Sequence, residues 1–155
     1  MIVFQNLSRI IIPSKREYID NIISKIVSEI NNLYLKIVEY ESGGNLDILG
    51  NLGFGLSLSI DEALKNAIEH GNGNDERKLV QMEYYIDSQK IQINVRDEGK
   101  GFNYKELINP TPGAEKGRGL MLIKNFMDEV TWNETGSEII MIKLKKTPVR
   151  TGGTA

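Results

Sequence analysis

Two stretches of alternating apolar and polar residues place the strongest constraint on how this chain folds. They span residues 78–86 and 91–96, and a short polar segment separates them. A period of two residues with such a break predicts a β-hairpin. The same reasoning predicts a second hairpin, in which strands at 131–134 and 138–144 flank Thr135-Gly136-Ser137. Strands that come as hairpins favour an α+β fold over a doubly wound sheet.

Apolar residues recur at helical spacing in three other segments, which are therefore predicted to be helices. A capping box formed by Ser14 and Glu17 is expected to start the first of them. The predicted helices span residues 15–40, 46–70 and 119–130. An extended segment at 2–12 comes first, and residues 97–116 are predicted to be a loop with a short helix at 104–108.

This order predicts a two-layer α/β sandwich of the α+β class, with the helices on one face of a mixed, mostly antiparallel sheet. The second predicted helix contains Gly50, Gly53 and Gly55. Each interior glycine weakens a helix by about 0.5–1 kcal/mol relative to alanine, and the sequence gives no reason for these three.

Composition narrows the classes of function. No Cys and a single His among 155 residues exclude disulfide scaffolds, thiolate metal sites and multi-histidine metal centres. A formal net charge of -2 provides no general attraction to nucleic acid or anionic membranes. No apolar run approaches the roughly 20 residues of a membrane span, and no signal peptide is evident. We therefore expect a cytoplasmic protein with one domain over residues 1–145 and a disordered tail at 146–155.

Glu62 and Asn66 form the first candidate site. They lie four positions apart on a predicted helix, so they share one face about 6 Å apart along the axis. A carboxylate there can accept a proton, and an amide oxygen can bind Mg²⁺. The alternative is a solvated polar stripe, because both residue types are common on surfaces.

The second candidate site is the segment Asp97-Glu98-Gly99-Lys100-Gly101, which directly follows a predicted strand. The Asp97 carboxylate can accept a hydrogen bond from an exocyclic amine. Gly99 and Gly101 let the backbone turn tightly beside a flat ligand. An ordinary turn is the alternative interpretation, because such a string is weak evidence when taken alone.

The third candidate site is Gly117-Arg118-Gly119, which opens a predicted helix. Free N–H groups and the positive end of the helix dipole suit phosphates there, and Lys116 and Arg118 can add charge. The segment is neither a Walker A loop nor a Rossmann turn. A flexible hinge is the alternative.

Together the three segments resemble the N, G1 and G2 boxes of the GHKL superfamily, the Bergerat-fold ATPases. They read E-x-x-x-N on a helix, D-x-G-x-G after a strand and G-x-G before a helix. The stretches SIDEALKNAIEHGN, INVRDEGKGF and GRGLMLIKNFMDEV look like those of the anti-sigma-factor serine/threonine kinase branch. The resemblance implies a two-layer α/β sandwich of the histidine-kinase-like ATPase type.

The resemblance also implies a role for each matching residue. Glu62 would be the catalytic base, Asn66 would hold the Mg²⁺ that bridges the phosphates, and Asp97 would receive the adenine amine. The glycines that would shape the adenine wall are Gly99 and Gly101. The residues that would contact phosphates are Lys116, Gly117, Arg118 and Gly119.

The implied function is an ATP- and Mg²⁺-dependent serine/threonine protein kinase that also acts as an anti-sigma factor. Its implied partners are a STAS-type anti-sigma-factor antagonist and a sigma factor, with no direct contact to nucleic acid or membrane. Relatives are often homodimers. The segment 102–116 is short for a kinase lid, which favours a non-catalytic, ATP-dependent partner-binding module as an alternative. A detached histidine-kinase catalytic domain and a simple ATPase are further alternatives.

Overall fold

A computed structural model describes residues 6–42, 49–100 and 118–144 of the chain. The elements in chain order are β1 (Asn6–Pro13), α1 (Glu17–Ser42), α2 (Leu49–Asn66), a π-helical turn η1 (Ala67–Gly71), β2 (Leu79–Ile86), β3 (Lys90–Asp97), α4 (Arg118–Phe126), β4 (Glu129–Trp132) and β5 (Glu138–Leu144). The short helix predicted at 104–108 and the tail predicted at 146–155 lie outside the described residues.

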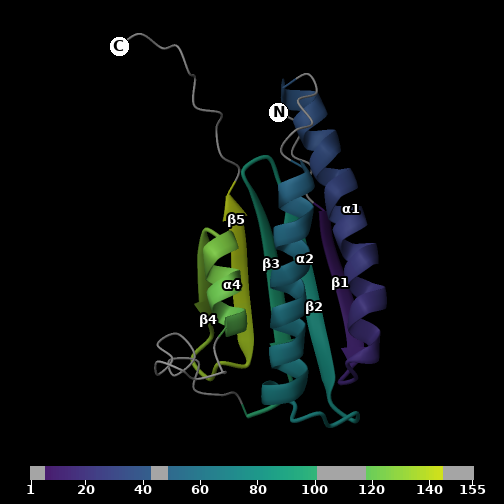
Figure 1. Cartoon of the computed structure of the whole chain (residues 1–155), viewed down its shortest axis with the longest axis vertical. Coiled ribbons are helices and arrows are strands. Elements are labelled where there is room, and N and C mark those ends of the chain that lie inside the picture. The colour runs from purple at the N-terminus through teal and green to yellow at the C-terminus, as the bar shows by residue number, and fades with distance from the viewer. Residues whose placement is uncertain (1–5, 43–48, 101–117, 145–155) are drawn as a thin grey trace.

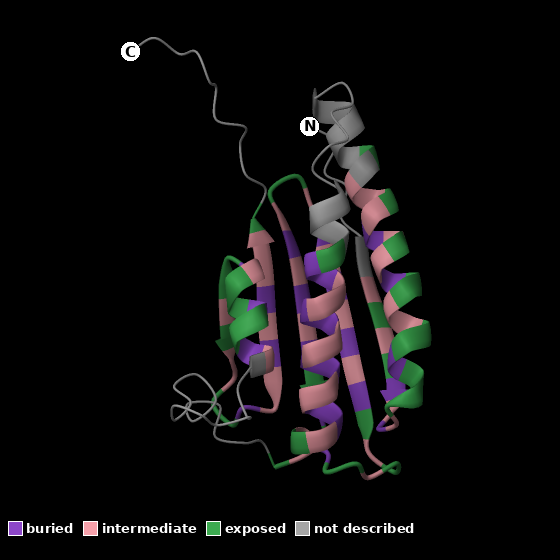
Figure 2. Ribbon diagram, in the orientation of Figure 1, coloured by how far each residue is buried: buried purple, intermediate pink, exposed green. Residues whose placement is uncertain are grey.

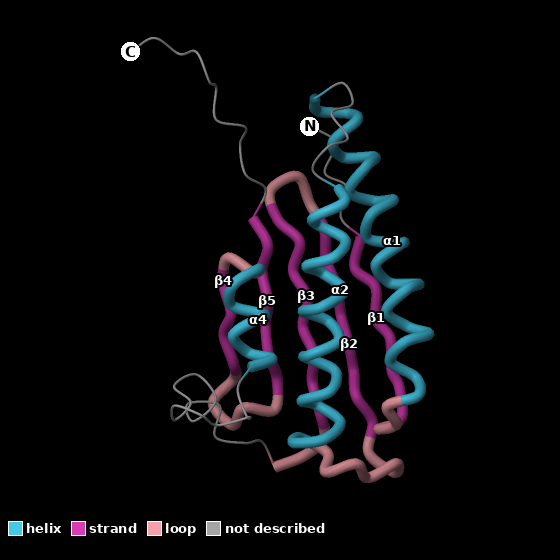
Figure 3. The backbone as a smooth tube through the Cα atoms, in the orientation of Figure 1, coloured by secondary structure: helices cyan, strands magenta, loops and turns pink. Residues whose placement is uncertain are grey.

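The strands form one sheet in the order β1-β2-β3-β5-β4. Helices α1, α2 and α4 cover one face of it (Figures 1 and 3). The predicted α+β sandwich and both hairpins are therefore confirmed. All four described strand pairs are antiparallel, whereas a mixed, mostly antiparallel sheet was predicted. The reason is that α1 and α2 run in opposite directions, so they return the chain to the end of the sheet where β1 stops (Figure 1).

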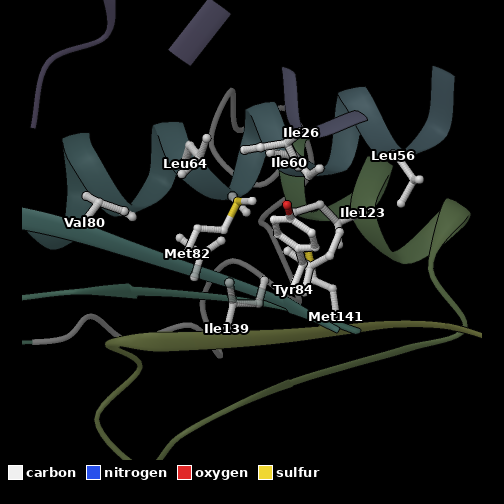
Figure 4. Packing of buried hydrophobic residues seen from close by; sticks show 14 of the residues in the cluster. Ile26, Leu56, Ile60, Leu64, Val80, Met82, Tyr84, Ile123, Ile139 and Met141 are labelled. Atoms are coloured by element: carbon white, nitrogen blue, oxygen red, sulfur yellow. The ribbon is translucent and has the colours of Figure 1, made fainter. Parts of the chain in front are cut away.

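The hydrophobic core fills the space between the sheet and the helices. Alternate residues of β2 and β3 are buried on the helix-facing side, as the period-two pattern predicts (Figure 2). Ile26 of α1, Ile60 of α2 and Ile123 of α4 close over them, and all three are fully buried (Figure 4). Burial of each such side chain contributes about 1.5–3 kcal/mol relative to leaving it exposed.

The third helix ends earlier than predicted. α4 stops at Phe126, whereas helical periodicity predicted a helix to residue 130. The Lys143 ammonium donates to the Phe126 carbonyl (2.7 Å), and the Asp128 N–H donates to the Ile142 carbonyl (2.9 Å). Because β5 takes up these groups, the chain turns after Phe126 and Val130 belongs to β4.

The second hairpin is also shifted from its predicted bounds. β4 covers residues 129–132, so Asn133 and Glu134 lie in the turn rather than in a strand. The Asn133 N–H donates to the Glu138 carbonyl (3.1 Å), and the Asn133 side-chain oxygen accepts from the Glu138 N–H (3.2 Å). Gly136 supplies the positive φ, 79°, that this turn requires.

Ser14 does not cap α1 as predicted. Its hydroxyl donates to the Lys78 carbonyl (2.7 Å) and accepts a hydrogen bond from the Asn72 amide (2.8 Å). Ser14 is only 2% exposed, so its hydroxyl serves a buried contact with segments far along the chain. The helix itself begins at Glu17.

Gly55 allows α2 and α4 to pack closely. A Cβ added at Gly55 would overlap the ring of Phe126 and lie 2.6 Å from its Cγ. This contact gives a physical reason for one of the three glycines that weaken the predicted second helix. The contact joins the first half of α2 to the last residue of α4, whereas the candidate site residues lie near the other ends of these two helices (Figure 1).

Candidate functional site

A pocket lies at the end of the sandwich where α2 and β3 stop and α4 begins. Asn66 and Asp97, from two of the predicted segments, both line it. The remaining described lining residues are Ala63, Ala67, Val95, Leu120, Trp132, Gly136, Ser137 and Ile139. The walls are largely apolar, and the polar groups are few, which is typical of a small-molecule site.

Asp97 is the buried carboxylate of this pocket. It is the last residue of β3 and is 6% exposed. Its Oδ1 accepts a hydrogen bond from the Gly99 N–H (2.8 Å), and its own N–H donates to the Ser137 carbonyl (2.9 Å). Burial raises the pKa of the Asp97 carboxyl, while the Gly99 hydrogen bond and the Lys78 charge oppose that rise. A carboxylate held in this way can accept a hydrogen bond from an amine in the pocket.

Two glycines pack directly against Asp97. A Cβ at Gly71 would overlap the Asp97 carboxylate, and a Cβ at Gly99 would overlap the Gly71 carbonyl and lie 3.0 Å from Asp97 Oδ1. Both positions therefore allow a close approach that a side chain would obstruct. The contact made by Gly71 was missed, because the sequence indicated only a helix stop there.

Glu62 meets the first turn of α4. A Cβ at Gly119 would overlap the Glu62 carboxylate and lie 2.9 Å from its Cδ. Gly119 therefore lets the carboxylate approach the helix N-terminus, where backbone N–H groups and the helix dipole favour negative charge. The structure brings together members of the first and third predicted segments. Asn66, one turn beyond Glu62, lines the pocket.

The side of the same helical turn that lines a groove shared with α1 carries an ion pair. Lys65 donates to Asp61 Oδ2 at 2.6 Å, four positions earlier in α2. This hydrogen bond is the main cause that raises the pKa of Lys65. The charge of Glu62 also raises the pKa of Lys65, but less than the Asp61 hydrogen bond does.

The donor set of the pocket fits a magnesium ion bound together with phosphates. The Asn66 carboxamide makes no capping hydrogen bond to the described groups of η1. Groups of three or more His, Cys, Asp or Glu that could hold a metal are absent from residues 6–42, 49–100 and 118–144. Mg²⁺ in nucleotide sites takes only one or two protein ligands and completes its shell with phosphates and water. The amide oxygen of Asn66, in a pocket that the Asp97 carboxylate also lines, matches that pattern.

Several predicted residues cannot be placed in the site. Gly101, Lys116 and Gly117 lie outside the described residues. Arg118 is the first residue of α4, but the structure does not describe its side chain. His70 lies on η1 with an exposed side chain.

The pocket also contains residues that the sequence did not indicate. Trp132, Gly136 and Ser137 of the second hairpin line it. They come close because β5 is the sheet neighbour of β3, so the turn before β5 lies beside the end of β3. The sequence predicted the hairpin but not its place in the sheet.

Comparison with known protein families matches residues 39–143 to the histidine kinase-like ATPase domain. The chain belongs to the histidine kinase-like ATPase family. It is similar to two curated proteins named serine-protein kinase RsbW, from Staphylococcus epidermidis and from Staphylococcus aureus strain JH9. Each is 35% identical to it over 109 residues, which cover 62% of this chain and 69% of the relative. Both comparisons confirm the family resemblance predicted from the sequence.

Among the described residues, no helix is both long enough and apolar enough to cross a bilayer.

Proposed function

We propose that this protein is an ATP- and Mg²⁺-dependent serine/threonine protein kinase and an anti-sigma factor of a partner-switching system. Its substrate is a STAS-type anti-sigma-factor antagonist. The observation that carries the proposal is the placement of the Glu62 carboxylate against the N-terminal turn of α4, beside a pocket lined by Asn66 and the buried Asp97. The similarity to proteins named serine-protein kinase supports the same conclusion.

The residues of the pocket divide the work of phosphoryl transfer. Asp97 accepts a hydrogen bond from the adenine amine, and the apolar walls enclose the purine. The first turn of α4, with Gly119, offers backbone N–H groups to the phosphates. Gly99 and Gly101 shape the wall beside Asp97, and the side chains of Lys116 and Arg118, together with Gly117, add phosphate contacts.

Glu62 is the base in this proposal. Its carboxylate takes the proton from a serine or threonine hydroxyl, whose oxygen bonds to the γ-phosphorus. The bond from that phosphorus to the bridging oxygen breaks, and ADP leaves with the electron pair. Asn66 would hold the magnesium ion, which would neutralise charge on the phosphates. Catalysis of this kind depends mainly on positioning and on electrostatic stabilisation.

Phosphate transfer to a purified STAS-domain protein tests this proposal. Radiolabelled ATP is expected to give an acid-stable phosphoprotein. Glu62→Gln should lower kcat about 100- to 10,000-fold, because general base catalysis contributes that much, while ATP binding persists. Glu129→Gln, an exposed carboxylate of β4, is the matched control and should leave kcat unchanged.

The same assay separates the alternatives. Binding of the STAS protein without phosphate transfer would favour a non-catalytic, ATP-dependent partner-binding module, which the short segment 102–116 favours. Acid-labile phosphate would favour a detached histidine-kinase catalytic domain. Normal transfer by the Glu62→Gln protein would refute the role of Glu62.

A further inference from the structure

Asn72 is a buried polar residue with no role in the proposed phosphoryl transfer. It follows η1 directly and is 3% exposed. Four segments meet around it at the end of the sandwich that carries the pocket: the end of η1, the junction of β1 and α1, the start of β2 and the turn after β3 (Figure 1). A buried carboxamide in such a place requires a partner for each of its polar atoms.

Every polar atom of the Asn72 side chain is paired. Its Nδ2 donates to the Leu79 carbonyl (3.0 Å) and to Ser14 Oγ (2.8 Å), and its Oδ1 accepts from the Glu98 N–H (2.8 Å). The Ser14 hydroxyl in turn donates to the Lys78 carbonyl (2.7 Å). A backbone carbonyl on one side and a backbone N–H on the other determine which end of the carboxamide is the donor.

These hydrogen bonds hold the Asp97 carboxylate from two sides. Glu98 lies between Asp97 and Gly99, so the bond from its N–H to Asn72 fixes the turn whose Gly99 N–H binds Asp97 Oδ1. Asn72 also follows Gly71 in the chain, and Gly71 packs against the same carboxylate. The Asn72 side chain therefore joins the end of η1 to the turn after β3.

We propose that Asn72 is a positioning residue for purine recognition. It holds the Asp97 carboxylate where the carboxylate can accept a hydrogen bond from the exocyclic amine of adenine. Asn72 thereby sets the preference for ATP over inosine triphosphate, which carries a carbonyl oxygen in place of that amine. This inference rests on the proposed function, in which Asp97 contacts the adenine amine.

Ser14 provides the matched control for Asn72. Both residues are buried in one hydrogen-bond network, so loss of either should destabilise the fold. Ser14→Ala keeps the hydrogen bond between Asn72 and the Glu98 N–H, whereas Asn72→Ser removes it. A merely structural role would give the two variants the same nucleotide preference, and a positioning role would not.

Dissociation constants for ATP and for inosine triphosphate, measured by calorimetry on the full chain and both variants, test the inference. The unchanged protein should prefer ATP. Asn72→Ser should reduce the ratio of the two constants about 10-fold, since a hydrogen bond to a charged group is worth at least that much. Ser14→Ala should keep the ratio. An unchanged ratio in Asn72→Ser, or an equal loss in Ser14→Ala, would overturn the proposal.

Hydrogen exchange provides a test that does not depend on the variants folding. In the full chain without nucleotide, the Glu98 amide should exchange slowly, because Asn72 binds it. Exchange as fast as that of an exposed loop amide would overturn the positioning role. An unchanged protein that binds ATP and inosine triphosphate equally would instead refute the proposed contact of Asp97 with adenine, and this inference would fall with it.

Discussion

The contact between Gly55 and Phe126 predicts that a substitution at Gly55 destabilises the chain when Phe126 is present and stabilises it when Phe126 is replaced by alanine. The substitution is Gly55→Ala, made in the unchanged chain and in a Phe126→Ala chain. Gly55 lies inside α2, and the Phe126 ring occupies the space that a Cβ would need. Removing that ring removes the obstacle without altering the helix.

Two opposing effects determine the expected magnitudes. Alanine in place of an interior glycine stabilises a helix by about 0.5–1 kcal/mol. Overpacking against a neighbouring side chain costs about 1–3 kcal/mol. Gly55→Ala should therefore lower the free energy of unfolding of the unchanged chain by up to about 2.5 kcal/mol. In the Phe126→Ala chain it should raise that free energy by about 0.5–1 kcal/mol, because only the helix effect remains.

Urea denaturation of the four proteins measures this coupling. The midpoints and slopes give a coupling free energy between the two sites, expected at about 1–3 kcal/mol. Ser57→Ala is the control: Ser57 lies on the same helix but lines a groove shared with α1. Its effect should be the same in both backgrounds. If Gly55→Ala changes stability by the same amount and sign in both backgrounds, the packing argument is refuted.

Two further substitutions test the site. Because burial raises the pKa of Asp97, the stability that this group contributes is present at low pH and is lost as pH rises through its folded-state pKa. Asp97→Asn should remove that pH-dependent loss of stability, which thermal unfolding between pH 4 and 8 measures. The same variant should bind ATP about 10-fold or more weakly. An Asp97→Asn protein less stable than the unchanged protein at neutral pH would contradict the desolvation argument. Gly119→Ala should displace the Glu62 carboxylate and lower the rate of phosphate transfer more than it weakens ATP binding. Met121→Ala, on the same helix but 54% exposed, should change neither.

The fold was predictable where a pattern is local. The alternation in residues 78–86 and 91–96 gave the first hairpin correctly, because sheet burial repeats every two residues. The end of α4 was missed, because two hydrogen bonds to β5 stop the helix. Lys143 of β5 donates to the Phe126 carbonyl, and the Asp128 N–H donates to the Ile142 carbonyl of β5. The periodicity of the helix does not encode these contacts. The capping box failed for the same reason, since Ser14 serves a partner far along the chain.

The candidate site was predictable where spacing determines a shared face. Glu62 and Asn66 lie on neighbouring turns of one helix, as their spacing requires, and Asp97 ends a strand as the alternation indicates. Gly71 and Asn72 were missed, because each acts through a contact across the fold. A glycine beside a carboxylate and an asparagine beside a turn have no sequence pattern that distinguishes them from ordinary loop residues.

The assembly of the pocket has a consequence for the link between folding and binding. Its walls come from α2, η1, β3, α4 and the β4–β5 hairpin, so no single element of the fold contains it. A ligand of the pocket therefore binds only chains in which these elements are packed together. A free ligand concentration of 100 times the dissociation constant would then add about 2.7 kcal/mol to the free energy of global unfolding. Saturating nucleotide would thus slow the proteolysis and hydrogen exchange that require global unfolding, including such events in α1, which lines no part of the pocket among the described residues.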